Sequence, residues 1–248
     1  DRIEVDENAT ADIDGTATDV DVDIAIIDTG IDQDHPDLNV VDGVRYYTSN
    51  SGPPWERGTI QDGNYDDDNG HGTHVAGTAA AVNNDVGVVG VAPGARLWAV
   101  KVLDANGSGY MSDIIAGVDW VTENAGVIEV ANMSLGGTGS SSSLRTAIQN
   151  SVGAGVVYIV AAGNDASDVY GADGKPNTDD DIIPAAYPEA AAISAMVDTD
   201  GQPGGNGPAT SYGDDDSFAS FSNFSATVVD GNPVISEGAA IDLLLPGV

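Results

Sequence analysis

Four short apolar runs, separated by helical patterns, constrain the fold more than any other feature of this sequence. The first run, VDVDIAIIDTGID (residues 20–32), alternates, becomes fully apolar and ends at Asp28, Thr29 and Gly30. Similar runs occupy residues 96–103, 127–135 and 156–164. Continuous apolar character over so few residues is typical of strands that are buried on both faces of a parallel sheet.

Helical patterns lie between these runs, over residues 71–82, 112–124 and 143–152. Later runs at residues 190–197, 218–224 and 241–247 predict further strands. Strands that alternate with helices predict an α/β fold with a mainly parallel central sheet and helices on both faces, in three layers. The length of 248 residues favours one domain over residues 1–248.

The net charge of the chain indicates which classes of partner it does not bind. There are 40 acidic residues against 7 basic ones, which gives a net charge of −33. Such a surface repels nucleic acid and anionic membranes. Because 41% of the residues are hydrophobic, a core can form, so we expect a folded protein adapted to high salt rather than a disordered chain. The long acidic loops at residues 48–70, 165–181 and 198–216 fit that expectation, and some of them are candidates for extra calcium.

Polar residues stand where three of the predicted strands end. Asp28 ends the first strand, Ser134 the third and Asn164 the fourth. The carboxyl ends of strands in open parallel sheets border one crevice, so we expect these side chains to face it together with His71, which begins a helix. A carboxylate there can accept the Nδ1–H of an imidazole and fix its tautomer.

His71 and His74 are also spaced to share a metal ion. No third ligand is evident, and no glutamate lies between them as it does in an HExxH site. We therefore expect His74 to be a buried helix residue.

The stretches AIIDTGID, GHGTHVAGT, NMSLGG and AAGN occur in this order along the chain. With them the chain resembles the subtilisin-like serine proteases, or subtilases, and its acidity resembles that of haloarchaeal members. The resemblance implies that Asp28 is the triad aspartate, that His71 is the general base and that Asn164 donates to the oxyanion hole. It also implies that two segments pair with an extended peptide substrate, namely Gly107, Ser108 and Gly109, and Ser134, Leu135 and Gly136.

The resemblance further implies a Ca²⁺ site. HPDL places Asp37 at a ligand position, and VNNDVGV matches the calcium loop of the family. The implied donors are the side chains of Asp37 and Asn84 and the carbonyls of Val82, Val86 and Val88, which as oxygen ligands suit a hard cation.

One expected motif is missing. The nucleophilic serine of the family lies in a GTSMA-type segment, which this sequence does not contain. The similarity continues up to LLLPGV, so we expect the chain to be trimmed at both ends, the serine to lie beyond Val248 and the 248 residues to be inactive alone.

The sequence therefore predicts a secreted, salt-adapted and monomeric serine endopeptidase that acts on protein or peptide substrates, with a propeptide outside this chain. Two alternatives stay open: a peptide-binding module without catalysis, and a calcium-dependent structural domain.

Overall fold

The structure is a computed structural model that describes residues 19–50, 57–84, 87–226 and 240–247. The chain divides into two compact units. The larger unit comprises Glu4–Ser134 and Thr146–Val157, and the second comprises Asp1–Ile3, Leu135–Arg145 and Tyr158–Val248. Each unit is described by itself below.

The sheet of the larger unit is built around β1 (Asp23–Asp28), which is buried along its whole length. It pairs in parallel with β4 (Arg96–Lys101) and β5 (Val130–Met133). Beyond β4, β2 (Val40–Ser49) is parallel to β4, and β3 (Gly58–Asp62) is antiparallel to β2. Because the side chains of β1 are buried on both faces of the sheet, its sequence is almost continuously apolar.

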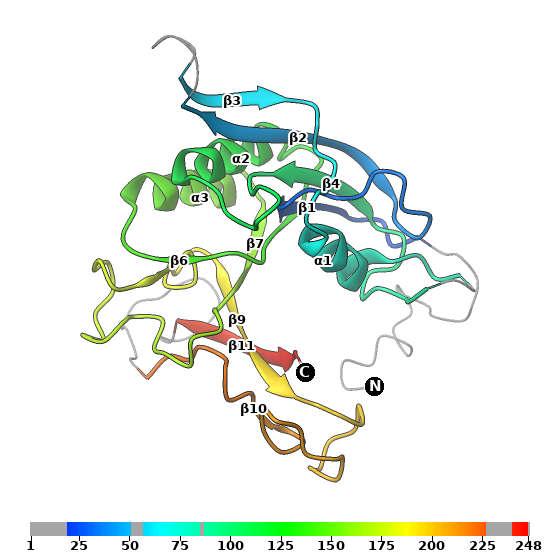
Figure 1. Cartoon of the computed structure of the whole chain (residues 1–248), viewed down its shortest axis with the longest axis vertical. Coiled ribbons are helices and arrows are strands. Elements are labelled where there is room, and N and C mark those ends of the chain that lie inside the picture. Colours follow the sequence, from blue (N-terminus) through cyan, green and yellow to red (C-terminus); the bar gives the residue numbers. More distant parts are fainter. Residues whose placement is uncertain (1–18, 51–56, 85–86, 227–239, 248) are drawn as a thin grey trace. The chain divides into compact units, whose positions relative to one another are not determined.

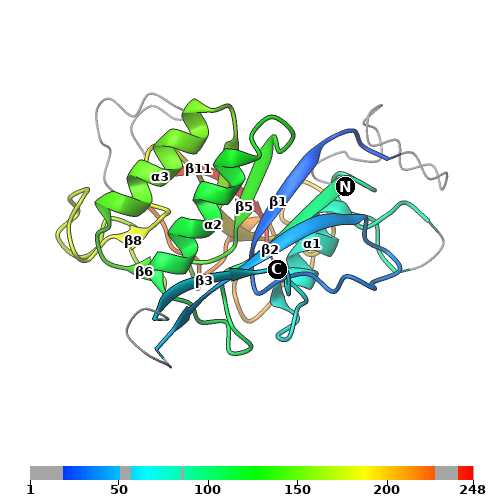
Figure 2. The same ribbon diagram turned by 90° about the horizontal axis from the view of Figure 1, so that it is seen from above.

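Helices cover both faces of this sheet (Figures 1 and 2). On one face, Ala76 and Ala80 of α1 (His71–Ala80) share a core cluster with Ile26 and its neighbours on β4. On the other, a Cβ on Gly117 of α2 (Met111–Glu123) would meet Ile27. Because consecutive residues of a strand point to opposite faces, Ile26 and Ile27 serve the two layers in turn.

The second unit contains the remaining strands. β7 (Val157–Ala161) and β9 (Ala191–Val197) are parallel, and β11 (Ile241–Pro246) is parallel to β9, whereas β10 (Ser217–Phe218) is antiparallel to it. A small antiparallel pair joins β6 (Gly137–Thr138) to β8 (Ile182–Ile183). The third helix, α3 (Ser142–Gly153), begins in the second unit, and its residues from Thr146 onward belong to the larger one. The predicted α/β class with a mainly parallel sheet and flanking helices is confirmed.

Three details of the prediction are wrong. The segment 48–70 is not one loop, because β2 and β3 form a hairpin across its first part. The run 218–224 is strand only at its first residue, in β10. His74 is exposed; the buried residues of α1 are Gly72, Ala76 and Ala80, and two residues from Gly72 turn the helix by about 200°, so His74 points away from the sheet.

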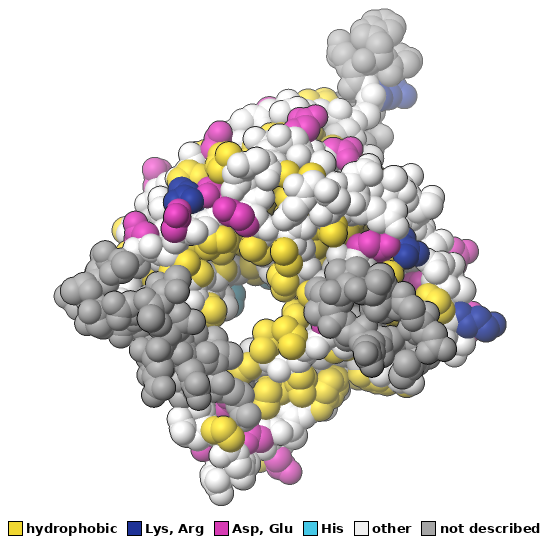
Figure 3. Space-filling view, turned by 180° about the vertical axis from the view of Figure 1, so that it is seen from behind, with side chains coloured by type: hydrophobic (Ala, Val, Ile, Leu, Met, Phe, Trp, Pro, Cys, Tyr) yellow, Lys and Arg dark blue, Asp and Glu magenta, His cyan; other side chains and the backbone are white. Residues whose placement is uncertain are grey.

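Acidic side chains lie at many separate points of the face in Figure 3 rather than in one patch. This distribution agrees with solvated surface charge more than with a single binding surface. Among the described residues, no helix is both long and apolar enough to cross a bilayer.

Candidate active site

The site begins with a carboxylate at the end of β1. Asp28 has an exposed fraction of 0%, and its backbone pairs with Lys101 of β4. Its Oδ1 accepts a hydrogen bond of 2.6 Å from the backbone N–H of Thr29. A buried carboxylate is stable only when hydrogen bonds or charges replace water, so the bonds to Oδ1 hold this side chain in one orientation.

His71, the first residue of α1, completes the pair. Its Nδ1 lies 2.8 Å from Oδ1 of Asp28, and the histidine side chain is 49% exposed while that of Asp28 is fully buried. A carboxylate accepts, so Nδ1 carries the proton and Nε2 is left as the acceptor. The arrangement can therefore take up a proton at Nε2 and stabilise the resulting imidazolium through Asp28.

The start of α1 follows from the glycines around His71. Gly70 precedes the helix with φ 102° and has no side chain to cap it. At Gly72, a Cβ would lie only 2.1 Å from the carbonyl oxygen of Gly30. Only a residue without a Cβ permits α1 to approach the end of β1 this closely, and that approach brings His71 to Asp28.

A second aspartate, Asp67, is partly buried close to the start of α1. Partial burial acts to raise the pKa of Asp67 in the loop before α1, but hydrogen bonds from Thr73, Gly70 and Asn69 outweigh it and lower that pKa to about 2. Asp67 is therefore an ionised residue with a fixed set of donors.

A buried lysine lies beside the pair. Lys101 is 4% exposed, and its Nζ donates to the carbonyl oxygen of Thr29 and to Oδ1 of Asp68 at 2.6 Å. Both contacts tie the end of β4 to the segment between β1 and α1. Lys101 also lines a pocket of about 490 Å³ together with Asp104, Ser108, Gly109 and Tyr110.

The first predicted substrate segment, Gly107 to Gly109, is exposed. It follows a turn in which Asp104 accepts from the backbone N–H groups of Ser108 and Asn106, and these bonds lower the pKa of Asp104. A Cβ on Gly109 would lie 2.3 Å from the carbonyl oxygen of Val102. The segment therefore packs closely against the backbone of Val102 at Gly109, while its residues remain exposed to solvent.

The second predicted substrate segment falls at the boundary of the two units, with Ser134 in the larger one and Leu135 and Gly136 in the second. The side chain of Asn132 donates to Oγ of Ser134 at 2.9 Å. Strand β6 begins directly after Gly136. Ser134 is thus engaged by Asn132, and within the described part of the chain no hydrogen bond joins its side chain to His71 or Asp28.

Asn164 lies in the second unit, in an exposed bend after β7. The residue that fixes this bend is Asn223, which is 0% exposed. Its Nδ2 donates to the carbonyl oxygen of Ala162, and its Oδ1 accepts from the N–H groups of Asp165 and Ser167. Sequence analysis did not identify this role, because nothing in the pattern distinguishes a buried asparagine from one in an exposed loop.

The residues predicted to hold Ca²⁺ are partly described. Asp37 is 4% exposed, its carbonyl oxygen accepts from Val82 N–H, and its Oδ1 lies 2.8 Å from Nδ2 of Asn84. A Cβ on Gly87 would come within 2.5 Å of Oδ2 of Asp37, so the loop closes over a buried carboxylate. Carboxylate, amide and carbonyl oxygens in such a cradle fit a hard cation. Val88 lies on the same loop with an exposed side chain, and Val86 lies outside the described residues.

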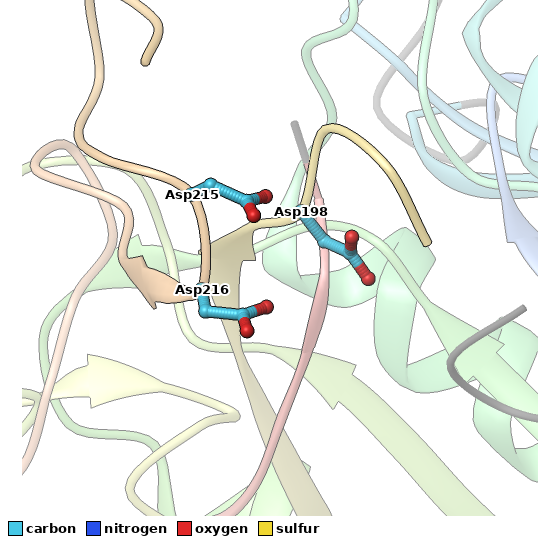
Figure 4. Close-up of side chains that lie close together, drawn as sticks. All are labelled: Asp198, Asp215 and Asp216. Atoms are coloured by element: carbon cyan, nitrogen blue, oxygen red, sulfur yellow. The ribbon is translucent and has the colours of Figure 1, made fainter. Parts of the chain in front are cut away.

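A second group of carboxylates lies in the second unit. Asp198, Asp215 and Asp216 offer oxygen atoms within 4.8 Å of one another, and Figure 4 shows Asp215 and Asp216 on one segment facing Asp198 on another. Two of these residues belong to the acidic run 214–216. Backbone N–H groups of Gly207 and Thr199 donate to Asp215, so hydrogen bonds within the loop already engage this carboxylate.

A model of the subtilase family, Peptidase_S8, matches residues 19–248. Subtilisin E of Bacillus subtilis (strain 168) is 45% identical over 175 residues, which cover 71% of this chain and 41% of that protein. Subtilisin Savinase of Lederbergia lenta is 38% identical over 227 residues, covering 92% of this chain and 64% of the relative.

Among solved structures, the crystal structure of a cold adapted subtilisin-like serine proteinase superposes with a TM-score of 0.61 at 32% identity. The match covers 91% of this chain and 63% of that one. The chain therefore spans less than two thirds of the length of these relatives.

Proposed function

The chain belongs to the subtilase family, as its four motifs predict, and we propose that the protein is a serine endopeptidase. In this proposal Asp28 orients His71, and His71 is the general base. The observation that carries it is the 2.8 Å contact between Nδ1 of a half-exposed histidine and Oδ1 of a fully buried aspartate. A pair of this kind is the proton-handling part of a Ser-His-Asp site.

The proposed reaction uses both nitrogens of His71. Nε2 takes the proton of the serine hydroxyl while Oγ forms a bond to the carbonyl carbon of the substrate peptide. The same proton then passes to the leaving amine as the C–N bond breaks, and water later repeats the sequence to release the acid. We propose Asn164 as the side-chain donor to the oxyanion. The serine itself has no candidate motif in this sequence, so we propose that a segment outside these 248 residues supplies it.

We propose that the substrate is an extended peptide, paired with the backbone of Gly107, Ser108 and Gly109 on one side and of Ser134, Leu135 and Gly136 on the other. The exposure of the first segment supports this. The pocket beside it, of about 490 Å³, has room for a substrate side chain.

We also propose one Ca²⁺ ion bound by Asp37, Asn84 and the carbonyls of Val82, Val86 and Val88. The burial of Asp37 and the cradle under Gly87 support it. When bound, the ion would brace the loop that follows α1 and so the helix that carries His71.

The surroundings of the enzyme are proposals as well. A net charge of −33 supports work at high salt, where ions screen repulsion between exposed carboxylates. We propose a secreted, monomeric enzyme with a single peptidase domain that acts on proteins outside the cell.

The experiment that tests this function is labelling of the protein from its native source with a fluorophosphonate probe, in high salt with calcium. Mass spectrometry then locates the labelled residue. We expect one labelled serine in a GTSMA-type peptide, and we expect the label to be lost in a His71→Ala variant. An unlabelled protein that still binds peptides would favour a non-catalytic module, and one that binds only calcium would favour a structural domain.

A further inference from the structure

One carboxylate lies between the end of β1 and the start of α1 and contacts both. Asp67 precedes His71 by four residues. Its Oδ1 accepts from the hydroxyl of Thr29 at 2.9 Å and from two loop N–H groups, and its Oδ2 accepts from the N–H and the hydroxyl of Thr73 at 2.9 and 2.6 Å. Five donors on one carboxylate hold it in a single position and keep it ionised.

The two threonines carry the contact across the junction. Thr29 directly follows Asp28, and its Oγ1 accepts from the N–H of Gly72 in α1 at 2.9 Å. Thr73 is in α1, and its Oγ1 accepts from the N–H of Asp32, beyond β1, at 3.0 Å. The hydroxyl beside the strand therefore accepts from an N–H of the helix, and the hydroxyl of the helix accepts from an N–H beyond the strand.

The charge of Asp67 sets the direction of these bonds. A hydroxyl has one proton to donate and two lone pairs to accept with. Since an ionised carboxylate can only accept, both threonines give their proton to Asp67 and keep a lone pair for the N–H group across the junction. An asparagine in place of Asp67 could accept hydrogen bonds only at Oδ1, because its Nδ2 is a donor.

The same bonds complete the N-terminus of α1. The first N–H groups of a helix have no partner within it, and Gly70 offers no capping side chain. Three side chains accept hydrogen bonds from these groups: Asn69 from the N–H of His71, Thr29 from that of Gly72 and Asp67 from that of Thr73. The cap comes from the loop and the strand, so the helix end is fixed relative to Asp28.

We propose that Asp67 is a positioning residue, which holds His71 against Asp28 by orienting the hydroxyls of Thr29 and Thr73. The proposal rests on the proposed role of His71 as the general base. Its geometric content, that Asp67 maintains the hydrogen bond between His71 and Asp28, is measurable without any catalysis.

The test compares Asp67→Asn with Asp66→Asn. Both changes remove one negative charge from neighbouring positions, but among the described residues the carboxylate of Asp66 accepts one long bond, of 3.4 Å, from the N–H of Gln33. Two readouts are taken by NMR on folded protein: the low-field proton on Nδ1 of His71, and the hydrogen exchange of the Gly72 and Thr73 amides. We expect Asp67→Asn to weaken or abolish the first and to speed the second by about tenfold, the effect of losing one charged hydrogen bond, and Asp66→Asn to leave both unchanged.

Thr29→Val and Thr73→Val serve if Asp67→Asn does not fold, because they remove a hydroxyl and keep both shape and carboxylate. Thr73→Ser keeps the hydroxyl and should restore the wild-type signal. A His71 proton signal and amide protection equal to wild type in the valine variants or in Asp67→Asn would overturn the proposal. A fall in Tm with an unchanged His71 signal would show a merely structural role and would overturn it too. Absence of a labelled serine would contradict the proposed protease function and leave these NMR results as they are.

Discussion

The close approach of α1 to the end of β1 makes Gly72 the most informative position in the molecule. A Cβ at this residue would lie 2.1 Å from the carbonyl oxygen of Gly30 and 3.2 Å from Cβ of Asp28, whereas an ordinary contact begins at 3.4 Å. The contact with Gly30 is to backbone, which has no rotamer to change. Gly72→Ala therefore has to move α1 away from β1, and the 2.8 Å bond between His71 and Asp28 lies on the same junction.

The magnitude follows from opposing terms. Alanine is favoured over glycine within a helix by about 1 kcal/mol. Overpacking costs about 1–3 kcal/mol, and loss of a hydrogen bond to a charged group costs about 1.5–3 kcal/mol. We expect a net destabilisation of about 2–4 kcal/mol, which for a chain of this size lowers Tm by roughly 5–15 °C.

Gly77→Ala is the matched control, because it lies in the same helix and a Cβ there would meet nothing within 4 Å. It should stabilise the protein by about 0.5–1 kcal/mol through the unfolded chain alone. The assay is thermal unfolding followed by circular dichroism in high salt, with the Nδ1 proton of His71 recorded for each variant. If Gly72→Ala raised Tm as Gly77→Ala does and kept the His71 signal, the steric reasoning would be refuted.

Three further outcomes follow from other residues. The pKa of Asp67 is lowered from 3.8 to about 2. The contribution of this carboxylate to the free energy of unfolding is therefore complete above pH 3.8 and is lost as the pH falls through 2. Because the side chain is partly exposed, we expect that contribution to be about 1 kcal/mol. Urea unfolding at pH 5 and at pH 2.5 should show that loss in the wild type and little of it in Asp67→Asn; an equal loss in both would contradict it. Leu97 is 0% exposed, so Leu97→Ala should lower the free energy of unfolding by about 2–5 kcal/mol. An unchanged denaturation midpoint would disprove the packing of α1 on β4. Calcium at a hundred times its Kd should stabilise the protein by about 2.7 kcal/mol, and Asp37→Ala should abolish the shift in Tm; a shift that persists would place the ion elsewhere.

The fold was predictable where burial leaves a mark on the sequence. β1 and β4 read as apolar runs because they are covered on both faces, and α1 and α2 follow from the spacing between them. β2 and β3 left no such mark, since β3 is a mostly exposed edge strand and β2 beside it has a single buried residue. A tertiary contact joins both strands to α2: the hydroxyls of Thr48 and Thr59 donate to Oδ1 of Asp113. No pattern along the chain shows that these three residues meet.

The site was predictable to the extent that topology brings strand ends together. Asp28 and His71 could be paired in advance because a carboxylate that ends a buried strand has few alternatives to a nearby donor. The residues that hold this pair and the neighbouring loops in place could not be predicted. Thr29, Asp67 and Asn223 are common polar residues in turns and loops, and their role depends on which N–H groups lie within reach.

The run Asp66, Asp67, Asp68 shows the physical reason. Three identical side chains in succession have different surroundings: the first is exposed, the second collects five donors at the start of α1, and the third pairs with buried Lys101. A net charge of −33 treats all 40 acidic residues alike, yet a carboxylate acts on the fold only where burial or neighbouring donors make its charge costly to remove. Adaptation to salt and support of the site can thus use the same residue type at neighbouring positions. Only Asp67→Asn, which removes the carboxylate that accepts these five hydrogen bonds, should affect His71, and Asp66→Asn should not.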